Sequence, residues 1–326
     1  MAHFLTVPIN ENGIITDKNI DTEIQRAAIA PFAFTDVFLY SHGWWTSAVA
    51  SMADYNDFSI GFARMLESLI GQVPNPLPNI APGFSALSIG MHWPSMLSED
   101  SSSVVNFVEA TSFFTMEFRA DDVGQTAGYA LLRLLLETRK GAAPFRFHLL
   151  GHSFGCRVVL STLEQLTADP ATLALAAQAQ FNVVLIEAAA DCDSLAPGRL
   201  YENVLTKFPK IKMLVTTSKN DKALNTWYPA AQKLAHLFRD PIDAMGAAGP
   251  VGVPAPGAIQ KITISLGNVP APTGKFVVAD LTPLHQARLK DPTLADDPTV
   301  HNAFSGQHSD IYVDEIYELL ALFLGS

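Results

Sequence analysis

The architecture of the chain can be inferred from one segment, Phe147-His148-Leu149-Leu150-Gly151-His152-Ser153-Phe154-Gly155-Cys156-Arg157-Val158-Val159. It begins with a short apolar run typical of a buried strand, and apolar side chains at helical spacing follow at Val159, Leu160, Leu163 and Leu166. Between the two lies Gly151-x-Ser153-x-Gly155. In so sharp a turn the serine adopts a strained backbone conformation, and the flanking glycines let neighbouring backbone pass without a Cβ clash. The pattern therefore predicts a strand–turn–helix unit that presents the Ser153 hydroxyl at the end of a sheet.

Length and composition favour a well-filled globular fold. The chain has 326 residues, of which 48% are hydrophobic and 16% charged, so no disorder signature is present. The net charge of −11 opposes binding to nucleic acid or to anionic membranes, because both require a basic surface. We therefore expect a small-molecule substrate and no nucleic-acid partner.

The sequence also indicates a cytoplasmic protein. No apolar run approaches the ~20 residues that span a bilayer, so we expect no stable membrane insertion. The start of the chain lacks a basic segment followed by an apolar one. The two cysteines, Cys156 and Cys192, provide no disulfide framework, and we expect them to be small buried apolar side chains.

Strands and helices are expected to alternate along most of the chain. We predict strands over residues 4–9, 37–40, 84–91, 181–186, 211–217, 261–266 and 276–281, besides the strand before Gly151. We predict helices over residues 57–70 and 122–140, after Ser153, and at the C-terminus behind an N-cap at Ser309 or Asp310. A turn at Glu11-Asn12-Gly13 suggests that the first strand forms an antiparallel edge of the sheet.

This alternation predicts an α/β fold, with a mostly parallel sheet flanked by helices on both faces. We expect one domain over residues 1–326. Residues 96–119 interrupt the alternation with an apolar, aromatic-rich segment, which we expect to be a helical insertion that forms an acyl pocket or lid near the active site. The alternative is an amphipathic helix that only packs on the core. Residues 240–258 are rich in Pro, Gly and Ala and are expected to form a loop.

A serine nucleophile needs a base, and histidine is the natural choice because its ordinary pKa is about 6.5. His308 stands out because it follows the last predicted strand and precedes the last helix, in Gly306-Gln307-His308. His285 is a rival and His301 a weaker one.

The base in turn needs a carboxylate that orients it. Asp221 follows the predicted strand 211–217, at the sheet edge where ligands of parallel sheets bind. Asp191 and Asp193 follow the preceding strand and are alternatives.

Acyl transfer also requires donors for the developing oxyanion. The backbone amide of Phe154, at the start of a helix, is one candidate. The other is the amide of Trp44, which follows His42-Gly43 at the end of the strand 37–40.

At these positions the chain resembles the α/β-hydrolase superfamily, and in particular poorly characterised bacterial members with a serine-esterase-like core. The matching features are His42-Gly43 after a strand, the Gly151–Gly155 elbow, and the order Ser153, Asp221, His308. The chain departs from lipases with a His-Gly-Gly-Gly loop, since two tryptophans follow Gly43. A serine at the elbow in place of aspartate argues against dehalogenase or epoxide-hydrolase chemistry.

The resemblance implies a Ser-His-Asp hydrolase that cleaves carboxylic esters, most readily apolar ones. Thioesterase, amidase, peptidase and acyltransferase activities would use the same groups, and a binding protein without turnover is the alternative of another class. No metal or organic cofactor is expected. The expected substrate pocket consists of residues from the loops after two strands and from the apolar segment: His42, Gly43, Trp45, Trp93, Phe113 and Phe114.

Overall fold

The computed structural model of the protein describes residues 3–29, 34–44, 46–78, 80, 84–96, 106–138, 146–235, 242–253 and 259–325. Its centre is an eight-stranded sheet in the order β1-β3-β2-β4-β5-β6-β8-β7, in which every strand pair is parallel. The strands are β1 (His3–Pro8), β2 (Asp36–Ser41), β3 (Ala86–His92), β4 (Arg146–His152), β5 (Gln180–Ile186), β6 (Ile211–Thr217), β7 (Gln260–Thr263) and β8 (Phe276–Asp280). The predicted parallel α/β sheet is confirmed.

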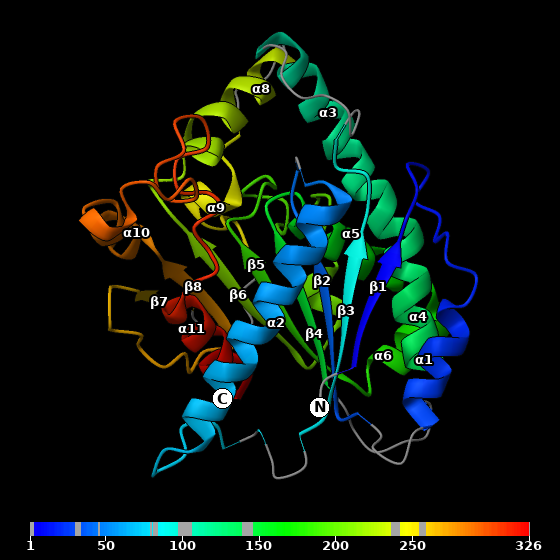
Figure 1. Ribbon diagram of the computed structural model, residues 1–326. Coiled ribbons are helices and arrows are strands. Elements are labelled where there is room, and N and C mark those ends of the chain that lie inside the picture. The colour runs from blue at the N-terminus through cyan, green and yellow to red at the C-terminus, as the bar shows by residue number, and fades with distance from the viewer. Residues whose placement is uncertain are drawn as a thin grey trace.

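Helices cover both faces of the sheet (Figure 1). They are α1 (Ile20–Ile29), α2 (Ala48–Ile70), α3 (Asn106–Val123), α4 (Tyr129–Thr138), α5 (Gly155–Thr167), α6 (Pro170–Ala176), α7 (Val204–Lys207), α8 (Tyr228–Ala235), α9 (Met245–Ala248), α10 (Thr282–Leu289) and α11 (Asp314–Gly325). Two π-helical turns, Gly124–Gly128 and Ala223–Trp227, lead into α4 and α8, and a 3₁₀ turn spans Pro292–Leu294. The paired helices α2 and α11 cover one face, and α5 with α3 and α4 covers the other.

The central strands have buried side chains on both faces because helices cover both. In β4, Leu149 belongs to the apolar core on the α5 side, whereas the next residue, Leu150, belongs to the core on the α2 and α11 side. Successive side chains of a strand point to opposite faces, so a strand buried on both sides becomes a continuous apolar run. This is why β4, β5 and β6 were recognisable in the sequence.

The expected antiparallel edge is wrong. Strand β1 pairs parallel with β3, from His3 opposite Leu87 to Pro8 opposite His92. The turn after it is present, but it returns the chain only to an isolated bridge between Ile9 and Ile15. The chain then enters α1 and crosses to β2, and such a helical crossover connects parallel strands.

Three expected helix boundaries also differ. The helix predicted from residue 122 begins at Asn106 and takes in most of the apolar segment, while residues 97–105 lie outside the described residues. Helix α2 begins at Ala48 instead of residue 57, because the Ser47 hydroxyl caps it by accepting the Ala50 amide at 3.2 Å. Helix α11 begins at Asp314, and neither Ser309 nor Asp310 caps it.

A buried polar cluster ties the starts of three central strands together. Asp36 of β2 accepts hydrogen bonds from Arg146 at 2.7 Å and from His148 Nε2 at 2.7 Å, and Asn182 of β5 donates to His148 Nδ1 at 3.0 Å. Burial of Asp36 opposes its ionisation, but the bonds from His148 and Arg146 outweigh burial and lower the pKa of Asp36 to about 2. Since this pKa lies below the ordinary value, Asp36 stabilises the fold above about pH 4 and loses that contribution as the pH falls towards 2.

We expect Asp36→Asn to lower the free energy of unfolding at pH 7 by about 2 kcal/mol, because it leaves half-buried Arg146 without its counter-charge and removes the charged acceptor of buried His148. The control Asp314→Asn should change it little, since its pair with Arg64 is exposed. Urea denaturation between pH 7 and pH 3 measures both effects. As the pH falls, the free energy of unfolding should decrease less in the Asp36→Asn protein than in the unmodified protein. Equal effects of the two substitutions would contradict the structural role of the cluster.

Candidate active site

Ser153 occupies a strained turn between β4 and α5. Its φ is +55°, a conformation uncommon for residues other than glycine. The turn is anchored to the loop after β5, because the Ser153 amide donates to the Ile186 carbonyl at 3.1 Å and the Ala189 amide donates to the Ser153 carbonyl at 3.2 Å. The expected elbow is therefore fixed by the neighbouring strand as well as by its own sequence.

Three glycines around the turn lie where a Cβ atom would clash. A Cβ on Gly155 would overlap the Ser41 carbonyl oxygen, and one on Gly151 would lie 2.5 Å from the Cys156 amide nitrogen. A Cβ on Gly43 would lie 2.8 Å from the Cβ of Ser153. The ends of β2 and β4 are thus in direct backbone contact, which brings the Gly43 loop against the elbow.

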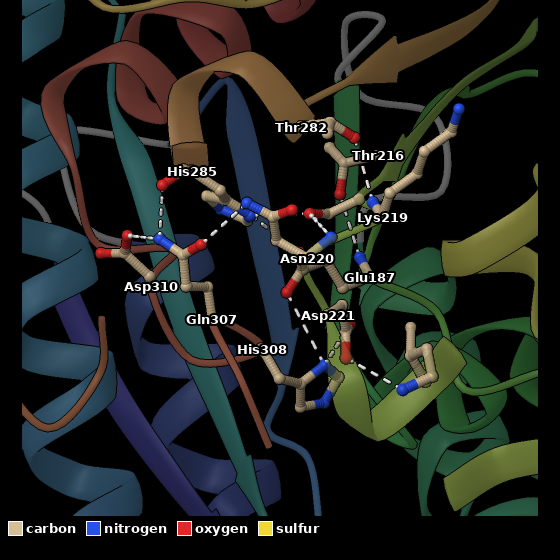
Figure 2. Close-up of polar contacts among 12 residues, drawn as sticks. Glu187, Thr216, Lys219, Asn220, Asp221, Thr282, His285, Gln307, His308 and Asp310 are labelled. Carbon is tan, nitrogen blue, oxygen red and sulfur yellow. Dashed lines mark hydrogen bonds and ion pairs between the residues drawn. The ribbon is translucent and has the colours of Figure 1, made fainter. Parts of the chain in front are cut away.

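His308 and Asp221 form a buried hydrogen-bonded pair, shown in Figure 2. The distance from His308 Nδ1 to Asp221 Oδ2 is 2.6 Å. The other carboxylate oxygen of Asp221 accepts the Leu224 amide at 2.9 Å, which fixes the side chain in the turn after β6. Because a carboxylate oxygen accepts, Nδ1 of His308 carries the proton of this bond and Nε2 is left for other partners.

Two loops distant in sequence are bonded together to form this pair. Asp221 and Gly306 make an isolated antiparallel bridge, and the Lys222 amide donates to the Ser305 carbonyl at 3.1 Å. Gly306 has φ +65°, and a Cβ there would lie 2.5 Å from the Asn220 carbonyl oxygen. The close approach that a glycine permits places His308 beside the end of β6.

His152 links the elbow to the His308 loop. Burial, reinforced by the nearby His308, lowers the pKa of His152 to about 3, so its ring is neutral. Its Nε2–H donates to the His308 carbonyl at 2.9 Å, and the two rings lie 4.8 Å apart between centroids. Ser153 Oγ forms no hydrogen bond with His308 among the described contacts, and such bonds often tighten only when substrate is bound.

The other candidate residues have different partners. His285 is buried with Nδ1 2.8 Å from the Ser218 hydroxyl, and burial lowers its pKa. His301 is exposed. Asp191 accepts from the Tyr228 hydroxyl at 2.7 Å, and Asp193 pairs with Arg199 at 2.5 Å.

One segment of the chain matches a known protein family. Residues 79–234, which include the elbow and Asp221, match the family described as "Alpha/beta hydrolase of unknown function (DUF900)". Together with the parallel sheet and the elbow after β4, this match decides the superfamily. The chain belongs to the α/β-hydrolase superfamily. A search of proteins with curated functions finds no match. In the described part of this hydrolase, no helix is long and apolar enough to cross a membrane.

The two residues predicted to supply oxyanion donors belong to the elbow and to the Gly43 loop that adjoins it. The Phe154 amide precedes α5 and donates no hydrogen bond among the described contacts. Trp44 follows Gly43, and its ring packs on the ring of Phe154 with centroids 6.2 Å apart. His42 anchors this loop to the loop after β3. Its ring stacks on buried Trp93 with centroids 5.3 Å apart, and its Nε2 accepts the Trp93 amide at 3.3 Å.

Helix α3 extends above the strand ends and contacts α8 there (Figure 1). Buried Phe113 of α3 packs against Phe154 at 5.0 Å, Tyr228 at 5.4 Å and Trp44 at 6.1 Å between ring centroids. An aromatic cluster therefore adjoins the elbow. Trp45 and the side chain of Phe114, both assigned to the pocket, lie outside the described residues.

Glu187, the residue that follows β5, is not among the site residues predicted from the sequence. Its carboxyl is buried beside His308, and with His152 and His308 it forms a group whose possible metal-ligating atoms lie within 4.8 Å of one another. One nitrogen of each histidine, His308 Nδ1 and His152 Nε2, already takes part in the hydrogen bonds described above.

We expect Gly155→Ala to lower the free energy of unfolding by about 3 kcal/mol, because the added methyl meets the rigid backbone of β2. Gly71→Ala is the matched control: Gly71 has φ −71° and an added Cβ would make only ordinary contacts. Chemical denaturation compares the two. A Gly155 substitution as mild as the control would show that the strand ends are not packed as described.

Proposed function

We propose that this α/β hydrolase cleaves carboxylic esters through an acyl-enzyme on Ser153, with His308 as general base and acid and Asp221 as its orienting carboxylate. The observation that supports this most strongly is the 2.6 Å bond between His308 Nδ1 and buried Asp221. It leaves His308 Nε2 as the basic atom of a ring held beside the elbow that carries Ser153.

The reaction divides into two acyl transfers. His308 Nε2 takes the Ser153 hydroxyl proton while Oγ attacks the ester carbonyl carbon, and Asp221 stabilises the imidazolium that forms. The Phe154 and Trp44 amides stabilise the tetrahedral oxyanion. His308 then gives its proton to the leaving alcohol. A water molecule, deprotonated by the same nitrogen, attacks the acyl carbon, and His308 returns that proton to Ser153 Oγ as the acyl–Oγ bond breaks and the acid leaves.

An apolar ester is the proposed substrate class. Half-buried Trp44 packs on the buried rings of Phe113 and Phe154 beside the elbow, so the surroundings of Ser153 on this side are apolar. This supports a substrate with an apolar acyl or alcohol group. Thioesters and amides would react at the same groups, so a panel of matched oxygen-ester, thioester and amide substrates ranks the three chemistries.

We expect Ser153→Ala to lower turnover of a p-nitrophenyl ester by roughly 10⁴–10⁶-fold, because no other group can accept the acyl chain. The fold should remain, since the glycines and hydrogen bonds of the elbow are backbone features. Initial rates with purified protein measure the loss.

His308→Ala should be nearly as damaging, and exposed His301→Ala should leave the rate near that of the unmodified protein. Retention of a tenth of the activity in the Ser153 variant would contradict the mechanism. An active His308 variant would instead assign the base to another residue.

We expect Phe113→Ala to change the preference between short and long acyl chains, because its ring packs directly on Phe154 beside the nucleophile. Phe118→Ala is the matched control, since this residue of the same helix is 68% exposed. The ratio of kcat/KM for butyrate and decanoate esters is the measurement. An unchanged ratio in soluble Phe113→Ala protein would show that the ring serves only the core.

A further inference from the structure

Glu187 carries a buried carboxyl without a hydrogen bond to any of the described residues. It lies directly after β5, is 0% exposed, and neither carboxyl oxygen has a hydrogen-bond partner in the described part of the chain. Figure 2 shows it between Asp221, His285 and His308. Only its backbone is bonded, with the amide donating to the Thr216 hydroxyl at 2.9 Å. Buried polar groups in folded proteins nearly always have partners, because leaving one unsatisfied costs stability. Such a group at this position therefore calls for a functional explanation.

Backbone strain sets Glu187 apart as well. Ser153 and Glu187 are the two non-glycine residues with positive φ in the described part of the chain, and φ of Glu187 is +46°. The two lie side by side, since the Ser153 amide bonds the carbonyl of Ile186. Strain of this kind is maintained mainly at functional sites.

The Glu187 carboxyl faces the two buried histidines at the end of the sheet. Its Oε2 lies 3.6 Å from His308 Nδ1, and its Oε1 lies 3.7 Å from His285 Nδ1. These distances are too long for hydrogen bonds. Asp221 already accepts the His308 proton at 2.6 Å, so Glu187 is the second carboxyl beside the same nitrogen.

The surrounding groups keep Glu187 neutral. Burial, followed by the charges of Asp221 and Asp310, holds the pKa of Glu187 well above its usual value. The buried Cys156 thiol faces it from α5, His285 from α10, and His152 and His308 from the two site loops. Asp310 is engaged elsewhere, because Arg288 donates to both its oxygens at 2.8–3.0 Å.

We infer that Glu187 is a second positioning residue for His308, able to accept the Nδ1–H bond in place of Asp221. The inference rests on the proposed function of Ser153 and His308. When the Asp221 charge is absent, the repulsion that keeps Glu187 neutral is reduced, and Glu187 ionises by releasing its proton to solvent. A shift of about 1 Å then brings Oε2 within hydrogen-bonding distance of Nδ1.

The test compares kcat/KM for a p-nitrophenyl ester in single and double variants. Asp221→Ala leaves His308 open to Glu187, and we expect a loss of about 10²-fold. Asp221→Asn places an amide beside Nδ1 and imposes the wrong tautomer, so a loss of about 10⁴-fold is expected. Glu187→Gln alone should lower kcat/KM about 3-fold. Added to Asp221→Ala, it should lower kcat/KM by a further factor of about 100.

The pH profile separates positioning from a purely structural role. In Asp221→Ala, activity should rise with pH as Glu187 ionises, because only the ionised carboxyl accepts the Nδ1 proton. This rise should vanish in the double variant. Asp191→Asn is the matched control: it removes a carboxyl that follows the same strand but binds Tyr228, and it should cause no further loss in Asp221→Ala.

Two results would overturn the inference. The first is that Asp221→Ala has a kcat/KM as low as that of Asp221→Asn. The second is that adding Glu187→Gln to Asp221→Ala leaves kcat/KM unchanged. If Asp221→Ala does not fold, Asp221→Ser repeats the comparison, since its hydroxyl can accept the Leu224 amide.

Ser153→Ala separates the two proposals. If it stays active, the proposed function fails; if it is inactive while Glu187→Gln has no effect in the Asp221 variants, only the role of Glu187 fails.

Discussion

Close backbone packing at the ends of β2, β4 and β5 is the constraint on which the site depends. Gly155 lies against the Ser41 carbonyl, and the Ser153 amide and carbonyl are bonded to the loop that follows Ile186. These contacts hold Ser153 at positive φ and bring the Gly43 loop against it. The buried Asp36–Arg146–His148 cluster ties β2 and β4 together at their other ends. The position of the serine is thus a property of the sheet.

The histidine is positioned by a different principle. The loop that carries His308 does not directly follow a strand. Backbone hydrogen bonds attach it to the turn after β6, and the His152 ring donates to the His308 carbonyl. Asp221 accepts the His308 Nδ1 proton, whereas burial and the nearby negative charges raise the pKa of Glu187 and keep it neutral beside the same ring. If His308 is the base, as we propose, two carboxyls beside its Nδ1 would allow the ring to stay oriented when one of them is lost.

The sequence was informative where short-range patterns determine structure. The apolar runs of β4, β5 and β6 and the Gly151–Gly155 turn are local signals, so the parallel sheet and the elbow could be predicted. The antiparallel edge was wrong because a turn at Gly13 does not reveal which strand lies beside β1. The extent of α3 was missed because its apolar residues lacked a clear helical period. Glu187 was missed because a glutamate before three alanines carries no signal until the fold places it against His308.

The most direct test of the account is to treat the purified protein with a fluorophosphonate and map the modified residue by mass spectrometry. We expect one phosphonylated residue, Ser153, and a much slower labelling rate in His308→Ala, because a base must take the serine proton as the hydroxyl attacks phosphorus. Unmodified Ser153 after exhaustive treatment, or a label on another residue, would contradict it.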